Sequence, residues 1–222
     1  MKVLMIIPCY NEELNIVNVY KDIKPILKYC DYIYVNDCSK DNSLSVLQEN
    51  KLEHLNLPIN LGLSGAVQAG YKYAYDNGYD AAIQFDGDGQ HKSEYITQMI
   101  ECIVQGNDIV VGSRFVTEKK PINARMLGSR LISLLIYIKT GKKISDPTSG
   151  MRMINRSTLY DFAYNLNRKP EPDTICLELA RGKKVKEVQV DMNDRCAGES
   201  YLNTWNSLKY MLKTCILIIF FS

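Results

Sequence analysis

The sequence has no cysteine pattern that would mark a disulfide framework or a zinc site. Its seven cysteines are odd in number and scattered along 222 residues, and no two of them form a Cys-x-x-Cys pair. This usage excludes a disulfide-rich scaffold and is typical of a protein kept in a reducing cytosol. Internal repeats and low-complexity tracts are also absent. The formal net charge of only +2 gives no support for nucleic-acid binding.

Hydrophobic stretches of the length that a membrane requires are lacking as well. The first apolar run, Val3–Ile7, is five residues long and follows a single lysine, so we expect no signal peptide. No uninterrupted run reaches about 20 apolar residues, so we expect no segment to cross a bilayer unaided. Hydrophobic residues nonetheless form 46% of the chain, which is enough for the core of a large globular domain.

Short apolar runs alternate with segments of helical periodicity. We expect strands at residues 3–7, 32–35, 54–57, 80–85, 108–111 and 185–190, and a loop with a short strand at 145–156. We expect helices at residues 11–29, 62–77, 93–105, 125–138, 171–181 and from about 203 onward, with a short one ending near 50. Asn11 would cap the first helix, Pro25 would kink or restart it, and Pro8 would end the first strand. The alternation predicts an α/β fold in which helices flank a mainly parallel, Rossmann-like sheet.

Polar residues directly follow four of the expected strands. The carboxyl ends of parallel strands meet at one edge of a sheet, where the ligands of such folds bind. We therefore expect four clusters to converge on one site: Pro8–Glu12, Asn36–Asp41, Asp86–His91 and Gly112–Arg114.

Two carboxylates, Asp86 and Asp88, stand at the end of an apolar strand with one glycine between them. Residues i and i+2 of a strand face the same way, and glycines let the backbone curl at the strand end. With Gln90 beside them, these oxygens form the kind of hard site that holds Mg²⁺ or Mn²⁺. The alternative is an Asp-Gly turn between a strand and a helix.

In their order, these clusters and three further motifs resemble the inverting nucleotide-sugar glycosyltransferases of family 2, which have the GT-A fold. The resemblance is closest to the branch of dolichyl-phosphate mannose synthase and the bacterial polyprenyl-phosphate glycosyltransferases. With no linker visible, we expect one GT-A domain over residues 1–200, divided into a nucleotide-binding half (1–115) and an acceptor half (116–200). Residues 201–222 would form a C-terminal amphipathic helix. The matching stretches are Pro8–Glu12, Asn36–Asp41, Asn60–Gly62, Asp86–His91, Gly112–Arg114, Asp146–Arg152 and Arg195–Ser200.

The resemblance implies that the first half binds a nucleotide sugar, with a UDP-sugar as the expected donor. Pro8 and Tyr10 would lie against the uracil, and Glu12 would lie near the ribose. Asp37 would accept hydrogen bonds from the base, and Gly62 would let the backbone approach the nucleotide. The alternatives are a core aromatic at position 10, a turn or helix cap at position 37, and close helix–sheet packing at position 62.

The loop around Asp37 departs from the family's usual Asp-Asp-Gly-Ser. Asn36 replaces the first acid, and Cys38 replaces the glycine. An asparagine can still contact the base. A Cβ at position 38, however, limits positive φ, so the sequence leaves the shape of this loop open.

The resemblance also implies a divalent cation, Mg²⁺ or Mn²⁺, bound by Asp88. Asp86 would lie near the ribose or reach the metal through water. Gln90 and His91 would complete the ligand shell or contact the donor, and the alternative for His91 is a structural or acceptor-side role. The cation would neutralise the charge that develops on the leaving diphosphate. Arg114 and Arg152 would lie near the pyrophosphate, although each could instead be an arginine at the surface or the edge of the core.

Inversion at the anomeric carbon requires a single in-line displacement. Asp146 and Asp173 are the candidate bases, and Arg195 opens an Arg-x-x-Gly-x-Ser loop that would close over donor and acceptor phosphates. Asp173 could instead cap a helix, and Arg195 could lie in a solvated loop. If the acceptor is a lipid phosphate, its oxygen is already anionic and base catalysis matters less.

The C-terminal segment combines apolar residues at helical spacing with Lys209 and Lys213, and ends in the apolar run Ile216–Phe221. Residues 119–156 hold nine Lys/Arg against one acid. We expect both segments to hold the protein peripherally against the cytoplasmic face of the membrane. The alternatives are a helix docked on the core, a basic face that is only solvated, a truncated chain, or pairing with another copy or a membrane partner.

These features together predict a metal-dependent inverting glycosyltransferase. It would transfer a hexose from a nucleotide sugar to a membrane-associated acceptor, such as a polyprenyl phosphate or a cell-surface glycan. One alternative is a sugar-1-phosphate nucleotidyltransferase, although the glycine-rich basic loop of that class is missing after the first strand. Another is an inactive nucleotide-binding subunit of a polysaccharide-synthesis complex.

Overall fold

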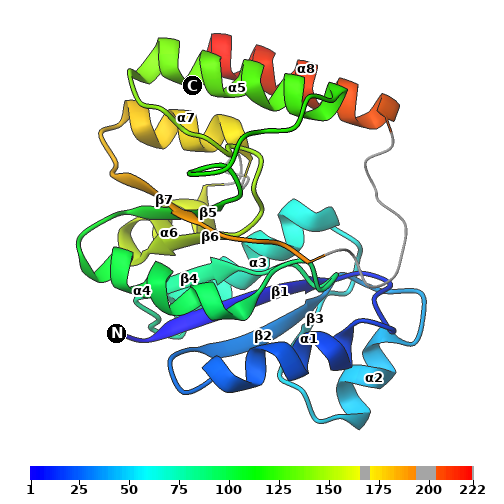
Figure 1. Ribbon diagram of the computed structural model, residues 1–222. Coiled ribbons are helices and arrows are strands. Elements are labelled where there is room, and N and C mark those ends of the chain that lie inside the picture. Colours follow the sequence, from blue (N-terminus) through cyan, green and yellow to red (C-terminus); the bar gives the residue numbers. More distant parts are fainter. Residues whose placement is uncertain (166–170, 194–203, 222) are drawn as a thin grey trace.

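The computed structural model describes residues 1–165, 171–193 and 204–221, and within these ranges seven strands form one sheet (Figure 1). The side chains of residues 124, 125, 204–210 and 221 lie outside this description. The strand order is β3-β2-β1-β4-β6-β5-β7. The strands are β1 (Val3–Cys9), β2 (Asp31–Asn36), β3 (His54–Asn56), β4 (Ala81–Gln84), β5 (Ile109–Ser113), β6 (Arg152–Asn155) and β7 (Val185–Gln189).

Helices cover both faces of this sheet, so the predicted α/β fold is confirmed (Figure 1). Helices α1 and α4 pack on one face, and α3 and α6 pack on the other. Short 3-10 turns span Lys24–Ile26 and Ser93–Tyr95. The described α-helices are α1 (Ile16–Ile23), α2 (Ser43–Glu49), α3 (Gly62–Asp76), α4 (Ile96–Val104), α5 (Ala124–Thr140), α6 (Arg156–Tyr164), α7 (Pro172–Ala180) and α8 (Thr204–Phe221).

Strand β6 is the one antiparallel member of the sheet among the described residues. It pairs antiparallel with β4 and β5, whereas every other pair of strands is parallel. The mainly parallel sheet is therefore confirmed. Because β6 runs in reverse, its first residue, Arg152, lies at the edge where the neighbouring strands β4 and β5 end.

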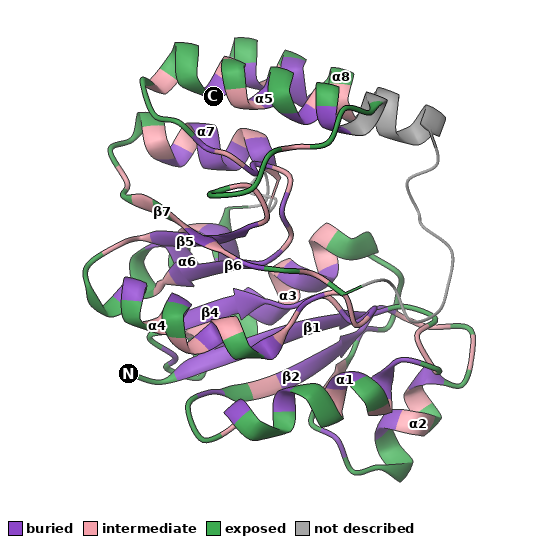
Figure 2. Cartoon of the chain, in the orientation of Figure 1, coloured by how far each residue is buried: buried purple, intermediate pink, exposed green. Residues whose placement is uncertain are grey.

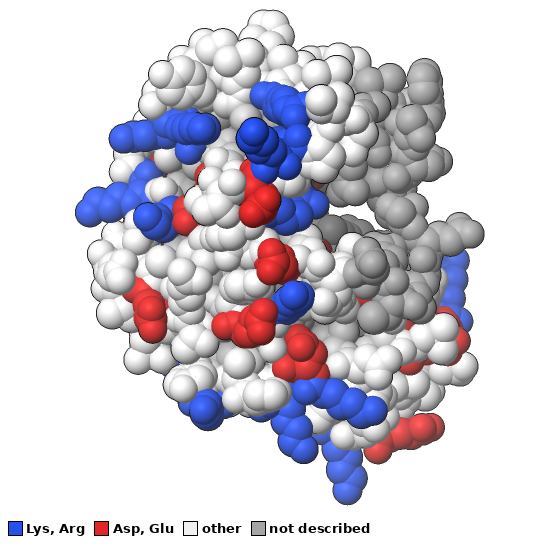
Figure 3. Space-filling view, viewed as in Figure 1, with Lys and Arg blue, Asp and Glu red and all other residues white. Residues whose placement is uncertain are grey.

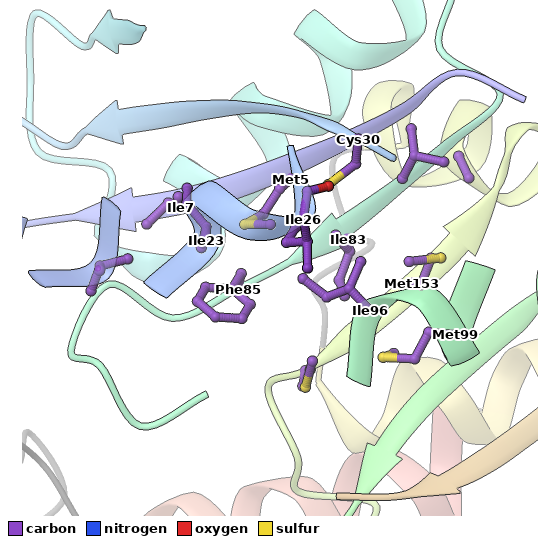
Figure 4. Close-up of a cluster of buried hydrophobic side chains, with 14 of the residues drawn as sticks. Met5, Ile7, Ile23, Ile26, Cys30, Ile83, Phe85, Ile96, Met99 and Met153 are labelled. Carbon is purple, nitrogen blue, oxygen red and sulfur yellow. The ribbon is translucent and has the colours of Figure 1, made fainter. Parts of the chain in front are cut away.

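The core consists of two apolar layers, one on each face of the sheet. Alternate residues of a strand point to opposite faces, so the odd residues Met5 and Ile7 face α1 and α4 while Leu4 and Ile6 face α3. Figure 4 shows the first layer, in which Phe85 and the strand residues Met5 and Ile83 lie near helix side chains such as Ile23 and Ile96. All seven residues of β1 are buried, as expected of a central strand covered on both faces (Figure 2).

The prediction that Asn11 caps the first helix is wrong. Helix α1 begins at Ile16, and Asn11 has a left-handed φ of 56°. The Asn11 side chain instead accepts a hydrogen bond from the backbone N–H of Lys40 (2.8 Å). Its position is thus set by a contact distant in sequence, which a local capping pattern cannot reveal. The expected break at Pro25 is confirmed, because this proline lies in the 3-10 turn that follows α1.

The prediction that Pro8 ends the first strand is also wrong, because β1 continues to Cys9. The carbonyl of Cys9 accepts from the backbone N–H of Asp37, so odd residues of β1 bond to β2 and the nitrogen of Pro8 faces the β4 side. Pairing with β4 has already ended there, at Ile6. The missing N–H of Pro8 therefore breaks no ladder bond.

Two helices bear on the predictions for the second half. Helix α6 was not anticipated, although Asn155 caps it by accepting from the N–H of Thr158 (3.0 Å). Helix α8 confirms the expected C-terminal helix and packs on α5 and α7, with Cys215 and Ile218 buried (Figure 1). Within the described residues, no helix combines the length and apolar character needed to cross a membrane.

Candidate active site

The polar clusters lie at one edge of the sheet. Strands β1, β2, β4 and β5 run in the same direction, so the loops that follow them share that edge. The reversed strand β6 brings the loop before it, residues 146–151, to the same place. This edge is where ligands bind in open parallel sheets.

The loops after β1 and β2 are hydrogen-bonded to each other. Asn11 donates its backbone N–H to Ser39 Oγ, and Glu12 donates its backbone N–H to Ser43 Oγ (2.9 Å). Glu13 and Asp41 are similarly linked, because the Glu13 N–H donates to a carboxylate oxygen of Asp41. The two predicted donor-binding loops therefore form one unit.

Asp37 ties this unit to the start of α3. It is buried (2% exposed), and its Oδ1 accepts from the backbone N–H of Leu61 at 2.7 Å. Gly62 follows with φ 73°, and a Cβ there would meet no atom of the described residues within 4 Å. Close packing on the sheet is instead seen at Gly70, where a Cβ would meet the Ile6 side chain.

Asn36 and Cys38 both have a defined place at the end of β2 and in the loop that follows it. Asn36 donates to Asn56 Oδ1 and accepts from both the N–H and the hydroxyl of Ser39, so its amide closes the loop. Cys38 has φ 56°, the left-handed conformation that a glycine would favour. The loop therefore holds Cys38, a residue with a Cβ, in a backbone conformation that is strained for it.

The other residues predicted to bind the nucleotide sugar lie at the end of β1 and in the loop that follows it. Tyr10 is 40% exposed, which excludes the alternative of a core aromatic. Glu12 is half-buried and accepts from Asn15 Nδ2 at 2.6 Å. Pro8 is buried, and its carbonyl oxygen would stand 2.7 Å from a Cβ at Gly87. Only a glycine at position 87 therefore lets the Asp86–His91 loop pack against the end of β1.

The carboxylate of Asp86 is held from two sides. Gln84 Nε2 donates to Oδ1 (3.1 Å), and His91 Nε2 lies 3.4 Å from Oδ2. His91 Nδ1 accepts from the backbone N–H of Asp86 (2.9 Å), so the ring proton belongs on Nε2. His91 is buried (3% exposed) and meets the Phe85 ring edge to face, which gives it a structural role in this loop.

Asp88 is nearly buried (7% exposed), and its Oδ1 accepts from the backbone N–H of Gln90 (3.0 Å). Gly89 has φ 77°, so the chain curls as the sequence predicted. The Gln90 carbonyl accepts from the N–H of Asn193, which ties the loop to the segment after β7. Within the described ranges, no three His, Cys, Asp or Glu side chains are grouped so that they alone could hold a metal ion. Two carboxylates with an adjacent amide fit a hard divalent cation that takes its other ligands from phosphate and water.

Arg114 and Asp146 form a two-point ion pair. The guanidinium donates from Nε to Oδ2 (2.7 Å) and from a terminal nitrogen to Oδ1 (2.9 Å), and the Arg114 backbone N–H also reaches Oδ2. Asp146 is 0% exposed, and the backbone N–H groups of Ser145 and Asp146 both donate to Glu187 of β7. A base needs an oxygen open to the substrate. The prediction of Asp146 as a base does not fit this geometry, and Asp146 instead orients Arg114.

Arg152 also differs from its predicted position beside the pyrophosphate. It is buried (4% exposed), and its guanidinium donates to the carbonyl oxygens of Pro147 and Ser149 (both 2.8 Å). It therefore braces the loop that carries Asp146. The sequence alone could not show this, because the acceptors are backbone atoms.

Asp173 lies in the first turn of α7, directly after Pro172. Burial raises the pKa of its carboxyl, and Glu171 adds to this, while Arg152 and Lys213 oppose it. A raised pKa suits a proton acceptor, so Asp173 stays a candidate base. Arg195, the third predicted catalytic residue, lies outside the described residues.

Two charged residues at this edge were not among the predicted site residues. Glu187 anchors the Asp146 loop, as described above. Lys120 donates to the hydroxyls of Ser129 and Ser133 on α5, and burial lowers the pKa of its ammonium. Lys120 belongs to the basic run of residues 119–156, and nothing in its local sequence distinguishes it from the other members.

The family of the chain follows from comparison with known proteins. A family model described as Glycosyl transferase family 2 matches residues 5–162, well over half of the chain. The chain belongs to glycosyl transferase family 2. The predicted family and enzyme class of this glycosyltransferase are thus confirmed.

Relatives of this family 2 glycosyltransferase include three lipid-phosphate glycosyltransferases. It is 31% identical to the UDP-N-acetylglucosamine–dolichyl-phosphate N-acetylglucosaminyltransferase of Methanococcus voltae over 188 residues, 75% of this chain and 74% of that protein. It is 28% identical to the undecaprenyl-phosphate mannosyltransferase of Micrococcus luteus over 215 residues, 91% of this chain and 88% of that protein. It is 31% identical to the dolichol-phosphate mannosyltransferase of Pyrococcus furiosus, with 95% of this chain and 62% of that protein covered.

Solved structures confirm the GT-A fold of the glycosyltransferase. The glucosyl-3-phosphoglycerate synthase of Mycobacterium tuberculosis, crystallised with Mn²⁺, uridine diphosphate and glucosyl-3-phosphoglycerate, matches with a TM-score of 0.69. The match covers 98% of this chain and 78% of that one, at 15% sequence identity. At this identity the likeness concerns the fold alone.

Proposed function

We propose that this glycosyltransferase transfers a hexose from a UDP-sugar to a polyprenyl phosphate at a membrane surface, with a divalent cation bound at Asp86 and Asp88. One observation carries the proposal: a chain of contacts joins all the loops at the sheet edge. A Cβ at Gly150 would stand 2.9 Å from Asp86 Oδ2, so the loop that carries Asp146 touches the predicted metal loop. Asp146 in turn holds Arg114. Contacts therefore connect the carboxylate proposed to bind the metal ion with the Arg114 guanidinium proposed to face the diphosphate.

The donor would lie across the loops after β1, β2 and β4. Tyr10 offers an exposed ring, Glu12 an acidic oxygen, and Asp37 a buried carboxylate behind the open turn at Gly62. Gln90 and the two aspartates would hold the cation, which neutralises the charge on the leaving diphosphate. Arg114, fixed by Asp146, supplies a second positive charge beside that group.

The reaction needs little further help from the protein if the acceptor is a lipid phosphate. Its anionic oxygen attacks the anomeric carbon, the bond from that carbon to the diphosphate oxygen breaks, and the electron pair leaves with the nucleoside diphosphate. No proton has to be removed in this displacement. The relatives' names, which specify dolichyl-, undecaprenyl- and dolichol-phosphate, support this acceptor class. For a hydroxyl acceptor, Asp173 would be the base.

The outer helices support peripheral membrane binding. Helices α5 and α8 lie side by side at the top of the molecule in Figure 1. Each presents exposed apolar residues at helical spacing, and Figure 3 shows Lys and Arg side chains just below the uppermost, uncharged atoms. We call these residues the α5–α8 face: Leu127, Leu131, Leu134 and Ile138 on α5, and Leu212, Ile216, Ile219 and Phe220 on α8.

The exposed basic residues near this face fit an anionic surface. Arg130 and Lys139 lie on α5 itself, Lys142 and Lys143 follow it, and Lys213 lies on α8, all of them exposed. An apolar strip with flanking positive charge binds the boundary of an anionic bilayer, where each basic residue near the surface contributes about 1 kcal/mol. The α5–α8 face would also suit a second copy of the chain, and flotation together with the oligomeric state distinguishes membrane binding from self-association.

Donor binding and turnover test the proposed activity. Calorimetric titration with UDP should show binding that strengthens with Mn²⁺, and a screen of UDP- and GDP-sugars with polyprenyl phosphate should give transfer from a UDP-hexose. Asp88→Ala should abolish the enhancement of UDP binding by Mn²⁺ and the transfer of the sugar. Metal-dependent UDP binding without turnover on any lipid-phosphate or glycan acceptor would instead favour an inactive nucleotide-binding subunit.

Flotation with anionic liposomes tests the membrane surface. The double variant Leu131→Glu/Leu134→Glu should lose flotation, because it places two charges in the α5–α8 face. Val104→Glu, at an exposed apolar position of α4, is the matched control and should float like the wild type. Equal flotation of the double variant and the wild type would reject the face as a membrane surface. A change in oligomeric state with flotation unaltered would assign the face to a second copy.

A further inference from the structure

Gln84 is a polar residue in the apolar core of the sheet. It ends the central strand β4, whose other residues are Ala81, Ala82 and Ile83, and it is only 3% exposed. Burying an amide costs free energy unless both of its ends are hydrogen-bonded. In the structure, Nε2 donates to Asp86 Oδ1 at 3.1 Å, while no donor among the described residues reaches Oε1. The amide is thus retained in the core with a single partner, and that partner is the carboxylate of Asp86.

The position of Gln84, which donates to Asp86, is fixed by strand pairing of its backbone. Gln84 pairs with Ile6 of β1 on one side and with Arg152 of β6 on the other. It is therefore paired on both sides within the sheet, whereas Asp86 lies two residues later in a loop. An amide on a rigid strand can orient a carboxylate on a neighbouring loop.

The surroundings leave the Asp86 carboxylate little freedom to turn away. His91 Nε2 lies 3.4 Å from its Oδ2, on the oxygen that Gln84 does not contact. A Cβ at Gly150 would stand 2.9 Å from Oδ2 and 3.3 Å from Gln84 Nε2, so the backbone at Gly150 closes the space beside the pair. The Asp86 side chain nevertheless remains 32% exposed, which leaves room for a ligand to approach.

We propose that Gln84 is a positioning residue that orients Asp86 for the divalent cation. Partners of this kind keep a ligand's oxygens in place, and removing one typically lowers metal affinity about 10–100-fold. This inference rests on the proposed function, because it takes the metal-dependent donor site as given. It adds a residue that touches neither cation nor donor and acts through Asp86.

The test is calorimetric binding of UDP at increasing Mn²⁺ by Gln84→Met, which keeps the length of the side chain and removes its donor. We expect the Mn²⁺ concentration for half-maximal enhancement of UDP binding to rise about tenfold. UDP binding without metal should stay at the wild-type value, because the base and ribose contacts are intact. If Gln84 had a purely structural role, the substitution would change both the Mn²⁺ requirement and the UDP binding measured without metal.

Gln68→Met is the matched control, because Gln68 Nε2 donates to carbonyl oxygens of Phe162 and Asn165 rather than to Asp86. It should keep the wild-type Mn²⁺ requirement. If Gln84→Met does not fold, Gln84→Asn provides the same test, since it keeps an amide that is one methylene too short to reach Asp86.

The outcomes separate this inference from the proposed function. An unchanged Mn²⁺ requirement in a folded Gln84 variant, with metal-dependent binding in the wild type, overturns the role of Gln84 alone. Wild-type protein that binds UDP without any effect of Mn²⁺ overturns both the inference and the metal-dependent donor site.

Discussion

Replacing Asp146 by asparagine should separate a positioning role from a catalytic one. The wild-type carboxylate has no exposed surface, and it accepts three hydrogen bonds from Arg114 and one from the Thr148 hydroxyl. Asparagine keeps the shape and one acceptor oxygen but removes the charge. Arg114 would then lose its counter-charge while remaining attached to the same loop.

The expected magnitude follows from the burial of the two partners. Removing one partner of a buried ion pair costs about 3–5 kcal/mol, because the other charge is left uncompensated. Here the Arg114 side chain is 23% exposed, so water solvates part of the freed charge. We therefore expect Asp146→Asn to lower the free energy of unfolding by about 2 kcal/mol, which corresponds to a fall in melting temperature of about 4–8 °C for a chain of this size.

The assay combines stability with kinetics. A double-mutant cycle with Arg114→Met, followed by urea denaturation, should give a coupling energy of about 1–3 kcal/mol. Turnover by Asp146→Asn should show a raised donor KM and a pH profile of wild-type shape. The reasoning fails if the coupling is below about 0.5 kcal/mol, the value for independent sites. It also fails if the variant loses a limb of the pH profile while stability and donor KM are unchanged, as a base would require.

Three further changes test other parts of the structure. Gly150→Ala should weaken Mn²⁺-dependent UDP binding in calorimetry while the melting temperature stays near wild type, because the added Cβ would press on the Asp86 carboxylate; unaltered metal dependence would contradict the contact. Gly70→Ala should lower the free energy of unfolding in urea by about 1–3 kcal/mol, because its Cβ would meet Ile6 in a packed core; an unchanged midpoint would show that α3 can shift. Asp173→Asn should raise the melting temperature at pH 7. The wild-type carboxyl has a raised pKa in the folded state, so its stabilising contribution is complete below the unfolded pKa and is lost as pH rises through the folded value. The difference between variant and wild type should therefore close in acid, and a difference independent of pH would refute the shift.

Sequence patterns could predict the sheet and its functional edge because both depend on local signals. Apolar runs such as Val3–Ile7 mark strands buried on both faces, and alternation with helices implies parallel pairing. Once the strands are parallel, the polar clusters after them must share an edge. The structure confirms this arrangement for the loops at Asp37, Asp86 and Arg114.

The failures concern residues whose partners lie far away in the chain. Asn11 has the residue type of a helix cap, but a loop 29 positions later holds it in a left-handed turn. Asp146 has the residue type of a base, yet Arg114, 32 positions earlier, occupies both of its oxygens. Local sequence states which chemistry a side chain can perform. Only tertiary contacts decide whether its atoms are available.

The reversed strand β6 has a mechanical consequence. It lies between β4 and β5 and bonds to both, so the segment after residue 115 is woven into the sheet that carries the Asp86 loop. No hinge can separate the two parts without breaking that ladder. Capture of substrates therefore cannot depend on a hinge between these two parts, and cross-linking β6 to its neighbours should leave turnover intact.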